Sequence, residues 1–357
     1  MSEKLRVALL FGGRSSEHDV SIMSATNVFG ALDPARYDVF PIGVSRAGEW
    51  IFCAPGAMPA AVPETGPRVA LLPGGRGRLA TLAAPGETAP ELPAIDLVFP
   101  VLHGPFGEDG TVQGAVALAD VPCVGPGVLA SAAAMDKEIA KRLLVGEGLA
   151  VARWRTVIAG EPLPTFDELT AELGRPLFVK PARQGSSVGV TKVETADELE
   201  PAIRNALKHD WKVLIEEFMR GREVECGVLE NEDGSLLASV PGEIVPTNRH
   251  AFYSYEAKYL DKDGADLRVP ADLPPGVSDK LRALSQRAFR ALGCEGMTRV
   301  DFFLTEDSEL IVNELNTIPG FTNISMYPKM LDATGVPYPE LVDRLIRHAI
   351  QRFSRGI

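Results

Sequence analysis

The chain has 357 residues, 45% of them hydrophobic and 24% charged, a balance typical of a folded protein with two or three domains rather than one core. A net charge of −12 argues against a broad nucleic-acid surface, although a small anion needs only a local group of cations. The four cysteines lie far apart without a CxxC pair, so neither a zinc knuckle nor a dense disulfide framework is indicated. No stretch has the roughly 18 apolar residues of a membrane span, and we expect a cytoplasmic protein without membrane insertion.

The first third of the chain has the pattern of an α/β unit built on a parallel sheet. Residues 5–11 are predicted to form a buried strand, followed by a glycine loop, a helix that begins at 15–16 and a second strand at 37–45. The segment 53–95 is rich in alanine, proline and glycine, and we expect a poorly ordered connection there. Another buried strand at 95–104 then opens into a glycine-rich loop.

The rest of the chain alternates helices and strands, and the alternation between about 137 and 223 predicts a small second domain. Apolar residues at helical spacing predict helices over 137–145, 196–208, 277–292 and 339–353. Short apolar runs predict strands over 175–182, 211–218, 223–230, 297–304 and 309–316. The last two strands are joined by a short polar turn, so we expect them to form a hairpin.

A loop with the composition of a phosphate-binding segment follows Lys180. Its sequence is Gly-Ser-Ser-Val-Gly at 185–189, in which the glycines allow close backbone approach. Backbone N–H groups and serine hydroxyls can then bind phosphate oxygens. The chain contains no Gly-Lys dipeptide, so this is not a Walker A loop. An ordinary hairpin turn is the alternative interpretation.

The predicted hairpin carries polar side chains in an alternating pattern. With a period of two, Arg299 shares a face with Asp301, and Glu314 shares a face with Asn316. Mg²⁺ prefers hard oxygen ligands, few of them from protein, with substrate phosphates completing the octahedron. Asp301, Glu314 and Asn316 suit that description. The alternative is a solvated outer face of the sheet.

The segment 247–264 is too polar for a core strand and unusually aromatic for a linker. Tyr253, Tyr255 and Tyr259 fall within seven residues, close to several basic side chains. A mobile lid that closes over a polyanion and excludes water fits this composition. The alternative is a surface that binds another protein.

Two weaker candidates lie in glycine-rich segments of the first unit. Glu17 falls in the first turn of the first helix, where a carboxylate is favourable whatever its function. His103 follows a strand end, the edge at which open α/β sheets bind ligands. The segment 12–18 does not match GxGxxG, so the dinucleotide fingerprint is absent.

Seven segments, in order and over essentially the whole chain, resemble the motifs of D-alanine–D-alanine ligases of the ATP-grasp superfamily. They are FGGRSSEHDVS (11–21), HGPFGEDGTVQG (103–114), MDK (135–137), KPARQGSSVGV (180–190), YEAKY (255–259), TRVDF (298–302) and NELNTIPGFT (313–322). The resemblance implies an α/β, three-domain ATP-grasp architecture, in which a parallel-sheet N-terminal domain precedes central and C-terminal α+β domains that clasp ATP. The implied domains are 1–136, 137–223 and 224–357, with a lid loop at about 246–264.

The resemblance also implies an ATP site and a metal site. The residues that it assigns to ATP are Lys137, Lys180, Ser187, Glu216, Glu217, Phe218, Met219, Glu223 and Lys258. Asp301, Glu314 and Asn316 would hold two Mg²⁺ ions, for which Mn²⁺ can substitute. Gln184 departs from the glutamate found in several relatives.

The implied reaction joins two D-alanines through a D-alanyl phosphate, for peptidoglycan precursors, and needs no serine or cysteine nucleophile. Arg299 and the backbone N–H of Gly320 would stabilise the tetrahedral oxyanion. Glu17 would hold the first D-alanine, linked by hydrogen bonds to Ser186 and Tyr259. The residues implied for the second substrate are His103, Asp301, Ser325 and Met326.

Several alternatives stand beside this assignment. Tyr259 in its YEAKY setting favours the dipeptide over D-alanyl-D-lactate, but a D-alanine–D-lactate ligase or another ATP-grasp carboxylate–amine ligase is the nearest alternative. A nucleotide-binding scaffold without turnover is opposed by the retained charged residues, and a nicotinamide dehydrogenase by the missing glycine fingerprint. D-alanine and ATP are the expected small-molecule partners, and the resemblance implies a homodimer.

Overall fold

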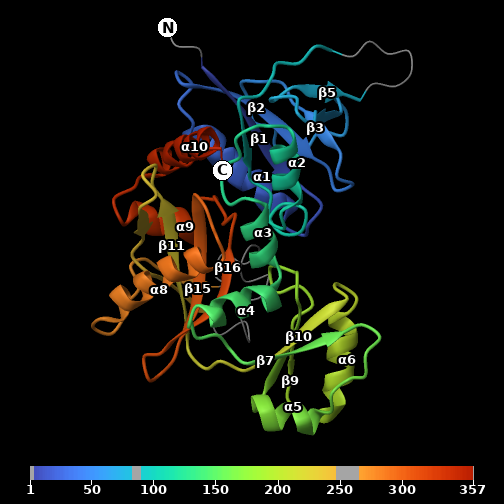
Figure 1. Cartoon of the computed structure of the whole chain (residues 1–357), viewed down its shortest axis with the longest axis vertical. Coiled ribbons are helices and arrows are strands. Elements are labelled where there is room, and N and C mark those ends of the chain that lie inside the picture. The colour runs from blue at the N-terminus through green and yellow to red at the C-terminus, as the bar shows by residue number, and fades with distance from the viewer. Residues whose placement is uncertain (1–3, 83–89, 247–264, 357) are drawn as a thin grey trace.

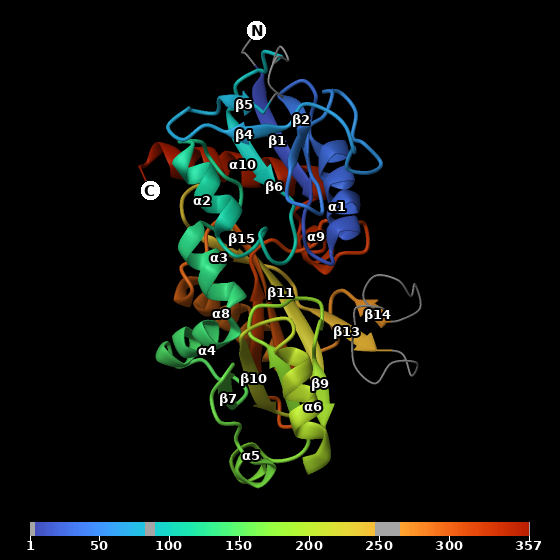
Figure 2. The same cartoon turned by 90° about the vertical axis from the view of Figure 1, so that its right-hand side faces the viewer.

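The computed structural model describes residues 4–82, 90–246 and 265–356. Three larger sheets follow one another along the long axis of the molecule (Figures 1 and 2). The sheet of the first third of the chain lies at one end, the sheet within 154–217 at the other, and the sheet within 222–316 between them. Within the described ranges, no helix is long and apolar enough to cross a membrane.

The N-terminal sheet explains why its strand β1 is apolar from Val7 to Phe11. Its strands are β1 (Leu5–Gly12), β2 (Tyr37–Val44), β3 (Trp50–Phe52) and β6 (Leu97–Pro100). The order is β3-β2-β1-β6, and β1 pairs in parallel with both β2 and β6, as the α/β pattern predicted. Odd-numbered residues of β1 pack toward α1 (His18–Ala31) and α10 (Tyr338–Ser354), and even-numbered ones toward α2 (Thr111–Leu118). Because helices cover both faces, alternation with polar residues is not needed.

The segment 53–95 is more ordered than its composition predicts. β4 (Val69–Leu71) and β5 (Leu79–Thr81) form an antiparallel hairpin that packs against the N-terminal sheet. The turn of this hairpin is fixed by the end of α2, since the Gly74 N–H donates to the Leu118 carbonyl at 2.6 Å. Three-residue strands carry too little periodicity to be recognised, and the end of α2 that fixes their turn is distant in sequence. The prediction of a poorly ordered connection is therefore wrong for the described part of this segment.

The central sheet is antiparallel throughout. Its strands are β7 (Trp154–Ile158), β8 (Leu177–Pro181), β9 (Thr191–Val193) and β10 (Lys212–Glu217), in the order β7-β10-β8-β9. α5 (Phe166–Leu173) and α6 (Ala196–Ala206) share one apolar core with the sheet. β8 ends at Pro181, as predicted, and opens directly into the candidate phosphate loop.

The C-terminal sheet contains the predicted hairpin. Its strands are β11 (Arg222–Glu230), β12 (Leu236–Ala238), β13 (Gly242–Pro246), β14 (Ala265–Arg268), β15 (Met297–Leu304) and β16 (Leu310–Asn316). The order is β14-β13-β11-β15-β16, and β12 pairs with β11. α8 (Val277–Ala291) packs against this sheet, and α9 (Met326–Asp332) lies next to β11. The hairpin β15–β16 is antiparallel, which confirms the prediction.

Two helices connect the units. α10 returns to the N-terminal sheet, where Leu341 and Leu345 join its core. α4 (Lys137–Gly146) follows α3 (Val128–Met135) and buries Leu144 in the core of the C-terminal sheet. Each of these two helices packs outside the domain to which the predicted limits assign it. The limits 1–136, 137–223 and 224–357 remain proposed domain boundaries. Besides the hairpin β4–β5, the elements that were not predicted from the sequence are α2, α3, α5, α9, β3, β7, β9, β12, β13 and β14.

Candidate active site

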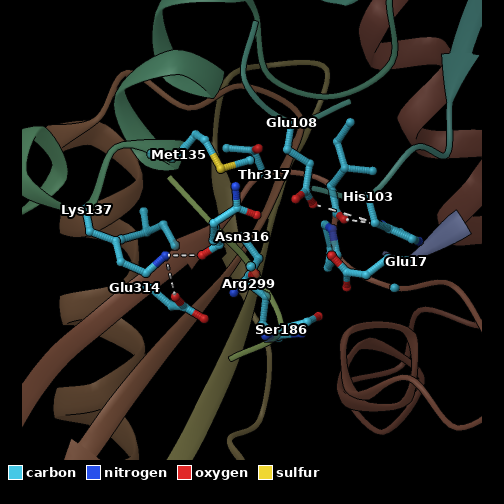
Figure 3. Close-up of a pocket in the computed structure, with 17 residues that line it drawn as sticks. Glu17, His103, Glu108, Met135, Lys137, Ser186, Arg299, Glu314, Asn316 and Thr317 are labelled. Carbon is cyan, nitrogen blue, oxygen red and sulfur yellow. Dashed lines mark hydrogen bonds and ion pairs between the residues drawn. The ribbon is translucent and has the colours of Figure 1, made fainter. Parts of the chain in front are cut away.

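Two adjoining cavities lie where the three units meet. The smaller measures about 680 Å³ and is lined from all three units (Figure 3). The larger measures about 1450 Å³ and lies between the central and C-terminal sheets. Lys137, Gln184, Gly185, Ser186 and Glu314 line both cavities. A molecule in the larger cavity could therefore present one end to a molecule in the smaller one.

The hairpin supplies one wall of the smaller cavity. In the β15–β16 register, Arg299 lies opposite Asn316 and Asp301 lies opposite Glu314, so the predicted common surface is confirmed. Arg299 Nε and Nη2 donate to the two oxygens of Asp301, both at 2.7 Å, and Nε lies 3.2 Å from Glu225 Oε2. This guanidinium is thus held by one carboxylate of its own strand, β15, and by one of the neighbouring strand β11.

Oxygen donors for a metal gather on this hairpin: Glu314 and Asn316 line the smaller cavity, whereas Asp301 lines neither cavity and contacts Arg299 and Asn316. Asn316 Nδ2 donates to Asp301 Oδ2 at 3.0 Å, and Glu314 stands beside them on the paired strand. Among the described residues, no three His, Cys, Asp or Glu side chains are grouped as metal ligands. Two carboxylates and an amide nevertheless fit Mg²⁺, which binds through few protein oxygens when phosphates supply the others.

Loops at the carboxyl edge of the N-terminal sheet supply the opposite wall. Glu17 is buried at the N-cap position of α1, and its side chain makes no capping hydrogen bond. A Cβ at Gly104 or at Gly185 would lie 3.3 Å from Glu17 Oε2, so this oxygen sits between the loop after β6 and the phosphate loop. The Glu17 carboxylate lines the smaller cavity. A favourable interaction with the dipole of α1 does not by itself explain why a carboxylate stands at this position.

His103 is fixed in this wall by contacts from other segments. Its Nδ1 lies 3.0 Å from the Ile318 carbonyl and its Nε2 lies 3.2 Å from Ser24 Oγ. Burial lowers the pKa of His103, and the nearby Glu17 carboxylate only partly opposes this effect. The ring is therefore neutral around pH 7.

The sequence analysis missed Glu108, although it quoted the motif that contains it. Glu108 lines the smaller cavity, and its Oε2 accepts the Gly104 N–H at 2.8 Å. Burial, followed by the charge of Glu17, raises its pKa well above the usual range. Its place in a glycine-rich loop directly after a strand was the available signal. This carboxyl holds its proton more readily than an ordinary glutamate.

The segment after β16 brings Gly320 into the smaller cavity. A Cβ at Gly320 would lie 2.6 Å from Ser325 Oγ, which explains the glycine. That hydroxyl accepts the Thr322 N–H at 3.0 Å, and Met326 begins α9 directly after it. Ser325 and Met326 adjoin the cavity through Gly320 and are not among its lining residues.

The larger cavity gathers most of the residues expected to bind ATP. Those that line it are Lys137, Lys180, Ser187, Glu216, Glu217, Phe218, Met219 and Glu223. The sequence analysis missed Phe178, whose ring stacks on Phe218 with centroids 5.6 Å apart, and also Lys192, Phe303 and Asn313. A lining that combines stacked phenylalanine rings with lysines suits a ligand with a flat base and an anionic tail.

Two of these glutamates use their side chains within the protein. The Glu217 carboxylate accepts the Arg153 backbone N–H and its Nε, both at 2.7 Å. The Glu216 carboxylate lies 2.8 Å from Lys180 Nζ and 3.2 Å from Lys141 Nζ. The Glu217 N–H also donates to the Arg153 carbonyl at 3.2 Å, so other backbone groups of 216–219 are the candidate contacts to a base.

The candidate phosphate loop at 185–189 is held at its N-terminal end, through Gln184. Lys137 Nζ donates to the Gln184 carbonyl at 2.6 Å and lies 3.7 Å from Glu314 Oε2 (Figure 3). The Gln184 amide donates to the His209 carbonyl at 3.2 Å, which gives this residue a structural contact. Ser186 and Ser187 have φ of 51° and 58°, a left-handed backbone that non-glycine residues seldom adopt. Such strain is characteristic of functional loops.

Lys258, Tyr259 and the rest of the proposed lid at 247–264 lie outside the described residues. Their assignments remain predictions.

Comparison with known proteins gives a consistent family. A family model described as D-ala D-ala ligase N-terminus matches residues 6–126, and one described as D-ala D-ala ligase C-terminus matches residues 143–347. The D-alanine–D-alanine ligase A of Mesorhizobium japonicum is 57% identical over 358 residues, which cover 99% of each chain.

Solved structures agree with this family. The D-alanine–D-alanine ligase from Coxiella burnetii has a TM-score of 0.87 at 35% identity, over 99% of this chain and 96% of that chain. The D-alanine–D-alanine ligase from Bacillus anthracis, solved in complex with ATP, has a TM-score of 0.73 at 28% identity, over 99% of this chain and all of that chain.

Proposed function

Because this chain belongs to the D-alanine–D-alanine ligase family, we propose that it joins two D-alanine molecules to D-alanyl-D-alanine at the expense of ATP, for peptidoglycan synthesis. One observation carries the proposal beyond family membership. The larger cavity, whose lining combines aromatic rings with lysines, adjoins the smaller polar cavity, and Lys137, Ser186 and Glu314 line both. A nucleotide and an amino acid could thus meet at their reacting ends. Since the reaction consumes ATP, we place it in the cytoplasm.

In the nucleotide site, Lys137 and Lys180 neutralise the phosphates. Ser187 and the backbone of its loop cover them, and Glu223 lies near the ribose. The backbone from Glu216 to Met219 flanks the adenine, and Lys258 reaches the γ-phosphate from the lid. Phosphoryl transfer depends mainly on positioning and charge neutralisation, which this set of residues supplies.

Asp301, Glu314 and Asn316 would hold Mg²⁺. When bound, the metal would neutralise charge on the transferred phosphoryl group. The donor set supports this assignment, since hard oxygens stand on two paired strands beside the cavity that would contain the phosphates.

The amino-acid site lies in the smaller cavity. Glu17 binds the ammonium of the first D-alanine, in a network with Ser186 and Tyr259. The carboxylate of this substrate attacks the γ-phosphorus, and ADP leaves. The resulting acyl phosphate presents an activated carbonyl to the second substrate.

The second step is amide formation. The amine of the second D-alanine attacks the acyl carbonyl and phosphate leaves. Arg299 and the Gly320 N–H stabilise the oxyanion that develops. The second substrate's carboxylate is bound by Ser325 and the Met326 backbone, with His103 and Asp301 nearby.

We also propose that the enzyme is a homodimer. Leu118, Val128 and Leu129 are apolar, lie on or between α2 and α3, and are 68%, 46% and 77% exposed. A second copy of the chain could cover them. Sedimentation of the purified protein tests this proposal, and a monomer at micromolar concentration would contradict it.

The reaction is tested by measuring ADP and phosphate release with Mg-ATP and identifying products by mass. The substrates are D-alanine, L-alanine, and D-alanine with D-lactate. We expect ADP release only with D-alanine, and D-alanyl-D-alanine as the product. Formation of D-alanyl-D-lactate from the mixture would move the protein to the depsipeptide ligases. Absence of D-alanine-dependent turnover would refute the proposal.

A further inference from the structure

Lys141 is a buried lysine to which the proposed function gives no role. It follows Lys137 by one helical turn, so both side chains leave the same side of α4. Its side chain is 2% exposed and lines neither cavity. The Nζ donates to the Ala152 carbonyl at 3.0 Å and lies 3.2 Å from Glu216 Oε1. Burial of an ammonium is costly unless it is paired, so this contact calls for an explanation.

Glu216 is shared between Lys141 and a lysine of the nucleotide site. Its Oε1 contacts Lys141, and its Oε2 lies 2.8 Å from the Nζ of Lys180, which lines the larger cavity. Burial alone would raise the pKa of Glu216, but the charges of the two lysines outweigh it and hold the pKa below its usual range. Burial lowers the pKa of Lys141, and the charge of Glu216 opposes this effect. Counting both lysines as cations, the three side chains carry two positive charges and one negative charge.

The net charge of these three side chains determines how much positive charge Lys180 presents to the larger cavity. With Lys141 in place, one carboxylate is divided between two ammonium groups, and one positive charge remains in excess. Without Lys141, the whole charge of Glu216 would fall on Lys180. The pair would then be neutral, and its attraction for phosphate oxygens would weaken.

We propose that Lys141 is a positioning residue of the nucleotide site, which shares the Glu216 carboxylate and so leaves the Lys180 ammonium only partly compensated toward the phosphates. The inference rests on the proposed function in one respect, the binding of a nucleotide in the larger cavity. It adds Lys141, a residue that lines neither cavity, to the machinery that recognises the phosphate chain.

A purely structural role is the competing explanation, because Lys141 also ties α4 to the central sheet. Lys212 offers a matched control for that role. It too is a buried lysine of this interface, with its Nζ 2.6 Å from Asp136 Oδ2 and 2.9 Å from Glu138 Oε2. It lines neither cavity.

The test measures the Kd of ADP with Mg²⁺ by calorimetry on the full chain. For Lys141→Met we expect affinity to fall roughly tenfold, as one favourable charge is lost. The double variant Lys141→Met/Glu216→Gln should bind ADP more tightly than Lys141→Met alone, because removal of the carboxylate frees Lys180 again. Lys141→Arg, which keeps the charge, should stay within about threefold of the wild type.

A structural role predicts different results. The double variant would then bind no better than Lys141→Met, and this outcome overturns the proposal, as would an unchanged Kd in Lys141→Met. Lys212→Met should lower the unfolding midpoint as much as Lys141→Met does, with its Kd for ADP within about twofold of the wild type. An equal loss of ADP affinity in Lys212→Met would contradict the proposal. Because the series needs no turnover, it can be decided whether or not the protein forms the dipeptide.

Discussion

The two walls of the smaller cavity are built in opposite ways. Arg299, Asp301 and Glu314 stand on the paired strands β15 and β16, whose register fixes their spacing. Glu17 and His103 come from the edge of the N-terminal sheet, and His103 is fixed by the Ile318 carbonyl of another unit. A wall built on a hairpin can hold charges in place through a reaction. A wall built from docked loops is better suited to selecting a substrate.

This contrast assigns different kinetic roles to the two walls. Variants of the hairpin wall should lose catalytic rate, and variants of the loop wall should lose affinity for D-alanine. The predictions below test this division in order of expected effect.

The largest effect is expected at Arg299. Arg299→Ala removes the cation proposed to stabilise the oxyanion, and kcat should fall about a thousandfold, or about 4 kcal/mol. It also leaves Asp301 and Glu225 without their shared partner, so the unfolding midpoint must be measured alongside. A folded variant with near-normal kcat would remove Arg299 from the chemistry.

Glu314→Gln should come next. Loss of one anionic metal ligand should lower kcat about a hundredfold and raise the Mg²⁺ concentration needed for half-maximal rate. The control is Glu309→Gln, an exposed glutamate at the turn before β16. An unchanged Mg²⁺ dependence in Glu314→Gln would contradict the metal assignment.

Glu17→Gln tests the loop wall. The ammonium of the first D-alanine would lose its counter-charge, so we expect KM for D-alanine to rise about tenfold with a smaller change in kcat. Asp19→Asn, an exposed carboxylate in the same helical turn, is the matched control. A fall in kcat at unchanged KM would place Glu17 in the chemical step and break the comparison.

The smallest effect concerns pH. Burial lowers the pKa of His103 in the folded chain, so the unfolded chain takes up a proton first as pH falls. The contribution of this residue to stability is complete above its unfolded pKa of about 6.5 and is lost as pH drops toward the folded value. Urea unfolding at pH 8 and pH 5.5 should therefore show a smaller pH dependence in His103→Asn than in the wild type. An equal dependence would mean that His103 does not titrate as its burial requires.

The same contrast explains what the sequence could predict. A period of two placed Arg299, Asp301, Glu314 and Asn316 on one surface, because a hairpin is a local structure. Glu17 and His103 were indicated mainly by the resemblance of their motifs, since no local pattern brings two loops together.

Features that depend on distant contacts were missed. Glu108 is distinguished by its burial, and Lys141 by its ion pair with Glu216 of the central sheet. Neither feature produces a periodic pattern in the sequence. The hairpin β4–β5 was missed because the end of α2 fixes its turn. The packing of α10 on the N-terminal sheet likewise follows from tertiary contacts.

The division of labour between the two walls can be followed by isotope exchange, which reports the first step of the reaction. ATP labelled with oxygen-18 at the β-phosphate is incubated with enzyme, Mg²⁺ and D-alanine, and movement of label into the β,γ-bridge is followed by phosphorus NMR. We predict D-alanine-dependent exchange in the wild type, its recovery in Glu17→Gln at saturating D-alanine, and its loss in Glu314→Gln at every D-alanine concentration. Exchange at the wild-type rate in Glu314→Gln, or its loss in Glu17→Gln at saturation, would contradict the account.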